Sequence, residues 1–137
     1  MIELRNVLHD DYKFLYDLLA QRDATINISH KSMPHWDQHV KFLSRTPYPY
    51  HKIIWYGDVR VGVCYVTAAG EIGIFIDRDH QRCGYGTQAV KEIIRIHAGR
   101  RLLANVAPLN TKSQALFMGL GFELIQYTYA LNRAQSV

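Results

Sequence analysis

A strand, a polar turn and a helix follow one another between residues 72 and 97. Residues 72–76 form an apolar run typical of a strand, and residues 88–97 place Val90, Ile93 and Ile94 at helical spacing. The segment between them contains Gln81-Arg82-Cys83-Gly84-Tyr85-Gly86-Thr87. This order predicts a sheet that carries a helix whose first turn is rich in glycine.

The glycine-rich turn predicts an anion-binding site. A helix start carries backbone N–H groups without intrahelical partners and the positive end of the peptide dipole. Gly84 and Gly86 lack Cβ atoms, so a pyrophosphate can reach these N–H groups, and Gln81 and Arg82 add side-chain donors. The alternative is a turn that only joins a strand to a helix.

The rest of the chain predicts alternating strands and helices. Alternating or apolar runs predict strands at residues 2–7, 52–56, 60–67, 71–76, 102–106 and 122–131. Helices are predicted after Asp10 or Asp11, from Ser32 to before Pro47, at residues 87–97, and from Asn110 to a left-handed cap at Gly121. The strand at 102–106 should run parallel to its predecessor through a right-handed crossover.

Size and charge narrow the class of protein. A chain of 137 residues, of which 48% are apolar, is the size of one domain, residues 1–137. Its net charge of +4 fits an anionic ligand better than nucleic acid. Cys64 and Cys83 lack metal-ligand spacing, so no metal is expected. The chain has no secretory leader and no apolar run of membrane-spanning length, and we therefore expect a cytoplasmic protein without a membrane partner.

Two motifs together resemble a known family. The pattern Gln81-x-x-Gly84-x-Gly86 after a strand resembles the acetyl-CoA-binding motif of the GNAT acyltransferase superfamily. The segment at residues 110–122, in which an asparagine opens a helix ending in Gly-Phe, is similar to that family's later motif. The resemblance implies an α/β fold of the α+β type. This expected fold has a central mixed, mostly antiparallel sheet with a splayed parallel strand pair and about four flanking helices.

The resemblance also implies a site for acetyl-CoA as co-substrate. The residues expected at this cofactor site are Ile74, Phe75, Ile76, Gln81, Arg82, Cys83, Gly84, Tyr85, Gly86, Thr87, Asn110, Ser113 and Phe117. The pantetheine arm should pair with the open edge of the strand at 71–76, and an amine should attack the thioester directly. Cys83 is not expected to act as a nucleophile, because direct transfer needs none.

Glu71 is the expected general base, since it begins the strand that carries the pantetheine arm, and His30 is a second candidate. Many family members have a tyrosine as general acid where this chain has Phe117. The general acid is then expected to be water, Tyr127 or Tyr129. Water can serve because a thiol with a pKa of about 8.5 leaves tolerably as the anion.

The acceptor is expected to contact His30, Trp36 and Tyr127, and it is a small amine, an amino sugar or a peptide N-terminus. Two other functions stay open: an acyl-CoA-binding protein without catalysis, and a phosphate- or nucleic-acid-binding module. The family normally ends in two antiparallel strands, whereas residues 122–131 contain no turn. The final strand is therefore single, or a second subunit of a homodimer supplies part of the sheet edge.

Overall fold

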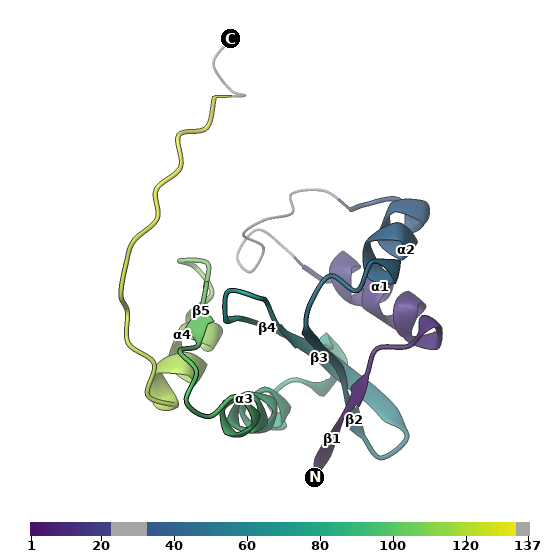
Figure 1. Cartoon of the computed structure of the whole chain (residues 1–137), viewed down its shortest axis with the longest axis horizontal. Helices are drawn as coiled ribbons and strands as arrows, with labels where there is room; N and C mark the ends of the chain where they lie inside the picture. The colour runs from purple at the N-terminus through teal and green to yellow at the C-terminus, as the bar shows by residue number, and fades with distance from the viewer. Residues whose placement is uncertain (23–32, 134–137) are drawn as a thin grey trace.

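A five-stranded sheet in the order β1-β2-β3-β4-β5 organises the computed structural model, which describes residues 1–22 and 33–133 (Figure 1). The strands are β1 (Ile2–Asn6), β2 (Tyr50–Tyr56), β3 (Val59–Val66), β4 (Glu71–Ile76) and β5 (Leu103–Ala104). Neighbouring strands from β1 to β4 are antiparallel, and β4 pairs with β5 in parallel. The predicted mixed, mostly antiparallel sheet is therefore confirmed.

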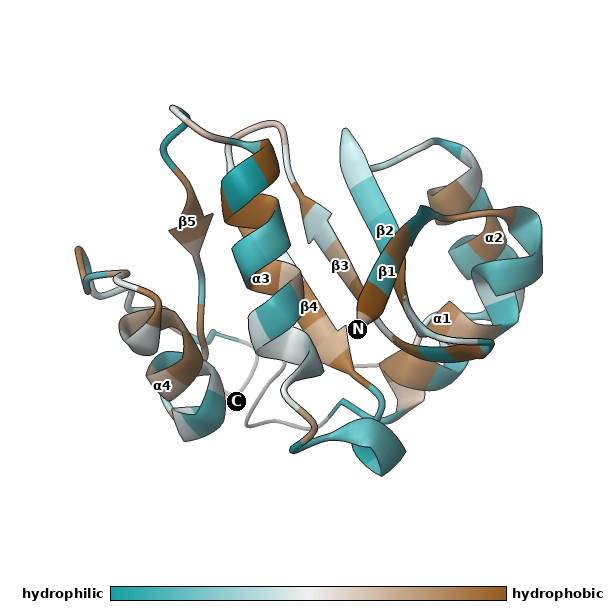
Figure 2. Ribbon diagram, turned by 90° about the horizontal axis from the view of Figure 1, so that it is seen from below, coloured by the Kyte–Doolittle hydropathy of each residue, from teal (hydrophilic) through white to brown (hydrophobic). Residues whose placement is uncertain are grey.

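Helices cover both faces of this sheet. They are η1 (His9–Asp11), α1 (Tyr12–Ala20), α2 (Trp36–Ser44), η2 (Arg78–His80), α3 (Tyr85–Ile96) and α4 (Thr111–Gly119). Figures 1 and 2 show α1 and α2 on the opposite side of the sheet from α3, with α4 beyond α3 towards β5. The chain passes from β4 through α3 to β5, and the two strands pair in parallel as predicted.

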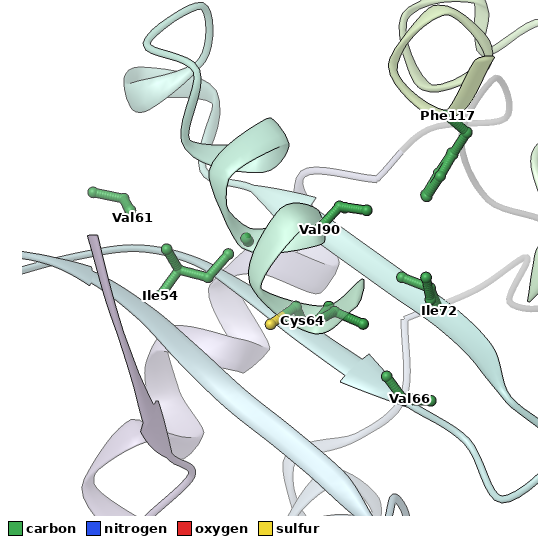
Figure 3. Packing of buried hydrophobic residues seen from close by; sticks show 9 residues of the cluster. Ile54, Val61, Cys64, Val66, Ile72, Val90 and Phe117 are labelled. Carbon is green, nitrogen blue, oxygen red and sulfur yellow. The ribbon is translucent and has the colours of Figure 1, made fainter. Parts of the chain in front are cut away.

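The larger core lies between the sheet and α3. Ala89, Val90 and Ile93 of α3 are fully buried against Cys64 and Ile72, and Phe117 of α4 closes one end of this cluster (Figure 3). The spacing of the three α3 residues puts them on one helical stripe. Since burying a large apolar side chain contributes about 1.5–3 kcal/mol, this stripe fixes α3 on the sheet.

A smaller core holds α1 and α2 on the other face, where Leu15, Leu18 and Leu43 pack against Ile53 and Val63. Ile53 and its neighbour Ile54 belong to different cores because successive strand residues point to opposite faces.

Asp11 anchors the start of α1. Its Oδ2 accepts a hydrogen bond from the N–H of Leu8 at 2.8 Å, and its Oδ1 accepts one from Arg60 at 2.8 Å. The carboxylate is only 4% exposed, so the paired arginine is what makes its burial tolerable.

The structure differs from the sequence-based expectation at β5 and at the C-terminus. β5 contains only Leu103–Ala104 of the predicted 102–106, because β4 and β5 separate beyond that point. Gly121 has the predicted left-handed conformation, with φ of +93°, and the N–H of Phe122 donates to Phe117 O at 3.0 Å. This bond closes α4.

The predicted final strand at 122–131 is wrong as a strand of this chain. Residues 122–133, named here the C-terminal arm, have no assigned strand and leave α4 with their end projecting beyond the helices and sheet (Figure 1). Alternation indicates only which side chains would share a face, whereas a strand also needs a neighbour for its backbone groups. The described part of one chain does not provide that neighbour.

Candidate functional site

A gap opens between β4 and β5 after the pair Ile72–Ala104, the last in their register. The N–H of Thr67 donates to Glu71 O, and the N–H of Asp77 donates to Val61 O. Odd-numbered β4 residues therefore bond to β3, and even-numbered ones face β5. Beyond Ile72, the N–H and C=O of Ile74 thus face the gap, where none of the described strands pairs with them.

The glycine-rich turn lies at the open end of this gap. Gly84 precedes α3 with φ of +79°, and a Cβ added there would meet nothing within 4 Å. None of the side chains in the described ranges caps the helix start. The amides of Tyr85, Gly86 and Thr87 precede the first bond of the helix, from the N–H of Gln88 to Gly84 O. They form an accessible cluster of donors with a favourable dipole for an anion.

Gly86 has a different role from Gly84. A Cβ at Gly86 would lie 3.4 Å from Leu116 Cδ1 and 3.6 Å from Ile76 Cγ1. The absent side chain therefore lets the first turn of α3 pack close to α4 and β4. Of the two glycines in the motif, only Gly84 faces open space.

The side chains of the turn form few hydrogen bonds. Gln81 Nε2 donates to Ile76 O at 3.2 Å, which ties the turn to the end of β4. Arg82 is exposed and adopts a positive φ of 66°, a conformation that costs a non-glycine residue about 1 kcal/mol or more. Cys83 is also exposed, with Sγ 3.7 Å from Gln81 O.

Glu71 marks the closed end of the gap. Its carboxylate accepts hydrogen bonds from Asn105 Nδ2 at 2.7 Å and from Thr67 Oγ1 at 3.4 Å. Its own N–H donates to Thr67 Oγ1 at 3.0 Å. The carboxylate is therefore held between the β3–β4 turn and the residue after β5, one register pair before the strands separate.

Tyr65 of β3 lies near β4 in the structure, and the sequence analysis did not identify it as a site residue. Tyr65 is the register partner of Gly73, the first β4 residue beyond the last pair with β5. A Cβ on Gly73 would lie 2.0 Å from Tyr65 Cζ, so the ring of Tyr65 lies directly over the glycine. Since the ring reaches from β3 across β4, its hydroxyl extends towards the gap. The only sequence signal was a glycine inside a strand, which often marks a close approach.

An aromatic cluster supports Tyr65. The ring of Tyr48 stacks on it with centroids 3.8 Å apart and planes 5° apart, and His51 meets Tyr48 edge-on at 4.9 Å. Burial, followed by the neighbouring Tyr65, raises the pKa of Tyr48 above its ordinary range. Burial lowers the pKa of His51 to about 4. Both groups are therefore neutral at pH 7.

The low pKa of His51 predicts an acid-sensitive fold. A folded-state pKa of about 4 lies below the unfolded value of about 6.5, so stability is complete above pH 6.5 and falls as the pH drops towards 4. Urea unfolding of His51→Phe should show a shallower acid loss than the parent chain. His39, whose pKa burial also lowers, should keep part of the slope. An identical pH dependence in both proteins would exclude His51 as a cause.

The later motif forms a helix cap and part of the core. Asn110 Oδ1 accepts a hydrogen bond from the N–H of Ser113 at 3.2 Å, which caps α4. Phe117 is only 6% exposed and meets Phe122 edge-on at 5.2 Å. Its side chain lies within the core cluster.

Two of the three predicted acceptor residues, Trp36 and Tyr127, are described, and both lie on elements other than β4 and β5. Trp36 begins α2, meets the ring of Tyr16 edge-on with centroids 5.2 Å apart, and meets the ring of His39 at a tilt with centroids 5.6 Å apart. Tyr127 lies in the C-terminal arm and is 74% exposed. His30 lies outside the described residues.

Neither a metal-binding cluster nor a membrane-spanning helix occurs in residues 1–22 and 33–133. Within these ranges, no group of three or more His, Cys, Asp and Glu residues is arranged to hold a metal ion. Likewise, none of the helices in the described part of the chain has the length and apolar character needed to cross a bilayer.

Comparison with known proteins shows the family of this chain and similar folds. The sequence model of the acetyltransferase (GNAT) family matches residues 6–122. Among curated proteins, the sequence has no match.

Solved structures resemble the whole fold. The protein yncA from Salmonella typhimurium, solved with acetyl-CoA, has a TM-score of 0.71 at 16% identity over 89% of this chain and 79% of that chain. A ribosomal-protein-alanine N-acetyltransferase from Brucella melitensis has a TM-score of 0.72 at 17% identity, covering 88% and 84%. A dodecameric spermidine N-acetyltransferase from Vibrio cholerae has a TM-score of 0.69 at 16% identity, covering 89% and 79%.

Proposed function

The chain belongs to the acetyltransferase (GNAT) family, and on this premise we propose that it is an N-acetyltransferase that moves an acetyl group from acetyl-CoA to a primary amine. The observation that carries the proposal is the alignment of the uncapped start of α3 with the open edge of β4. Residues 1–137 act as a single domain in this proposal.

The described residues fit the parts of acetyl-CoA. The amides of Tyr85, Gly86 and Thr87 suit the pyrophosphate, because Gly84 leaves open space beside them. The N–H and C=O of Ile74 suit the amide groups of the pantetheine arm, as a further strand would. When bound, acetyl-CoA supplies an activated acetyl group at the inner end of the gap.

Glu71 is proposed as the general base. The attacking amine must lose a proton, and the Glu71 carboxylate is the acidic side chain at the closed end of the gap whose position hydrogen bonds fix. Backbone N–H groups beside the gap would stabilise the negative charge that develops on the thioester oxygen.

Tyr65 is proposed as the proton donor to the leaving thiolate, in place of the tyrosine that Phe117 replaces. Its hydroxyl-bearing end lies over Gly73 at the start of the gap, and the stacked Tyr48 fixes the ring. Tyr127 and Tyr129, the earlier candidates, are 74% and 90% exposed in the C-terminal arm. Tyr65 is therefore better positioned for this role within one chain.

The Tyr65→Phe variant should lower kcat by about 10- to 100-fold. This loss is small for the removal of a general acid, because a thiolate is a tolerable leaving group without protonation. Acetyl-CoA affinity should stay within about twofold, since the ring and its stacking remain. A lower kcat at unchanged acetyl-CoA affinity separates a role in proton donation from a role in binding. Tyr50→Phe, which removes a buried hydroxyl without a described partner, is the control and should keep full activity. Unchanged kcat in Tyr65→Phe would reject the role.

The acceptor is proposed to be a small amine, an amino sugar or a peptide N-terminus. Relatives of known fold act on spermidine and on a ribosomal protein, so the fold accommodates both classes. His30, Trp36 and Tyr127 stay proposed acceptor contacts, Tyr127 from a second copy in a homodimer. The free thiols of Cys64 and Cys83 fit the reducing cytoplasm, where we propose that the protein acts.

A two-stage experiment tests this function. Calorimetry with acetyl-CoA measures binding, and a panel of polyamines, amino sugars and peptides is then screened for release of free thiol. Saturable binding and thiol release with one amine class are expected. Binding without turnover on any acceptor would favour an inactive acyl-CoA-binding protein. Absence of binding would reject the proposal.

A further inference from the structure

Arg22 follows α1 and carries a charge without a carboxylate partner among the described residues. Its guanidinium lies over the ring of Phe75 on β4, with Cζ 5.3 Å from the ring centroid, and the residue is partly buried. It takes part in none of the ion pairs within residues 1–22 and 33–133. Burial raises the pKa of Tyr48, and the charge of Arg22 partly opposes this rise, so the guanidinium acts on that ring as well.

The other arginines that stack on rings are paired. Arg5 and Arg60 both lie over the ring of Trp55, with Cζ 4.5 Å and 4.6 Å from its centroid. Each also has a carboxylate oxygen 2.8 Å away, on β1 for Arg5 and on η1 for Arg60. In the described part of the chain, Arg22 is therefore the ring-stacked arginine whose charge no carboxylate neutralises. Its N–H donors are available for an anion.

The end of α1 is fastened beside β4. Gln21 Nε2 donates to Asp77 Oδ1 at 3.2 Å, and Gln21 Oε1 accepts from the N–H of Arg78 at 3.0 Å. The Asp77 carboxylate also accepts the N–H of Asp79 at 3.2 Å. These bonds hold the backbone of Arg22 next to the residues that follow β4. A cation that is held in place before binding loses less entropy when it contacts a ligand.

One face of β4 connects Arg22 to the proposed base. Glu71, Gly73 and Phe75 point to the side of the sheet that α1 covers, because alternate strand residues share a face and Phe75 packs against the smaller core. The ring of Tyr65 covers Gly73 between them. Four strand residues, about 13 Å, separate Glu71 from Phe75. An aromatic surface beside the gap therefore has a carboxylate at one end and a guanidinium at the other.

We propose that the acceptor amine also carries an anion, a phosphate or a carboxylate, which Arg22 binds while the amine faces Glu71. The inference rests on the proposed acetyl transfer and names the class of its acceptor. Arginine binds both anions through paired N–H groups, with hydrogen bonds roughly twice as strong as neutral ones. The contact would also orient the amine for attack. A polyamine brings only positive charge, which the same guanidinium repels.

Pairs of acceptors that differ only in the anion test this class. Thiol release by the parent chain is measured with glucosamine 6-phosphate against glucosamine, and with aminocaproate against hexylamine. The kcat/KM of the anionic member should be at least about 10-fold higher in one pair, and the pair that shows this distinguishes phosphate from carboxylate. Spermidine should be a poorer acceptor than that anionic member.

Arg22→Gln removes the charge and keeps a polar side chain. It should lower kcat/KM for the preferred anionic acceptor by about 10- to 100-fold, mainly through KM, and leave the neutral member within about twofold. A purely structural role would lower both equally. Arg22→Lys keeps the charge and should restore part of the preference. Arg5→Gln removes a ring-stacked arginine at the other edge of the sheet and, as the control, should keep the preference.

Acceptor binding to the coenzyme A complex separates this inference from the proposed function, because it needs no turnover. Calorimetry should show the preferred anionic acceptor binding to the parent complex, and about 10- to 100-fold more weakly to Arg22→Gln. Thiol release without a preference for the anionic members would reject the role of Arg22 and leave acetyl transfer standing. Arg22-dependent binding without thiol release from any amine would reject acetyl transfer and keep the anion site. Absence of anionic acceptor binding to the parent complex, or equal losses for both members of a pair in Arg22→Gln, would overturn the inference.

Discussion

Replacing Gly84 with glutamate is expected to weaken acetyl-CoA binding at least about 100-fold, which corresponds to about 2.7 kcal/mol. The glutamate side chain would enter the open space beside the α3 amides and place a negative charge where the pyrophosphate should bind. Calorimetry would measure the loss directly.

Gly99→Glu is a closely matched control for this change. Gly99 has φ of +83° and open space around it, as Gly84 does, but it follows the other end of α3. Both variants should lose similar thermal stability, since both force a side chain into a left-handed conformation. Only Gly84→Glu should lose affinity. Equal affinities in the two variants would show that the anion does not bind at the start of α3.

Replacing Glu71 with glutamine is expected to reduce kcat by about 10²–10⁴-fold, the usual worth of a general base. Glutamine keeps an oxygen for Asn105 Nδ2 and a similar shape, so the local structure and acetyl-CoA affinity should be retained. The loss should be greatest at low pH, where the neutral amine is scarce. Steady-state kinetics across pH, together with calorimetry, separates turnover from binding.

Glu3→Gln is the control for the same chemical change at the opposite edge of the sheet. Glu3 lies on β1 in an exposed ion pair with Arg5, far along the strand order from β4. It should keep full activity. If Glu71→Gln also retained full kcat at every pH, Glu71 would not be the base, and another group or water would have to accept the proton.

Local patterns in the sequence were enough to predict most of the fold. The runs of Ile, Val and Tyr in β2 and β3 are typical of strands, and the stripe of Val90 and Ile93 on α3 is typical of a helix that packs on a sheet. The same holds for the turn at Gly84, because its positive φ and the helix after it are consequences of a few neighbouring residues. Patterns of this kind are visible without knowledge of which elements are neighbours in space.

Features that depend on strand register were not predictable. The contact between Tyr65 and Gly73 exists because β3 and β4 pair with these two residues opposite each other. The packing of Gly86 against Leu116 likewise requires knowing where α4 lies. The alternation of residues 122–131 predicted a strand that the structure does not contain, because alternation does not show whether a neighbouring strand is present.

A crystal structure of the full chain with coenzyme A is the most direct test of the central claim. The account predicts the pyrophosphate within hydrogen-bonding distance of the amides of residues 85–87, and the pantetheine arm beside Ile74 between β4 and β5. A coenzyme bound elsewhere, or β4 and β5 paired along their full length in the complex, would contradict it.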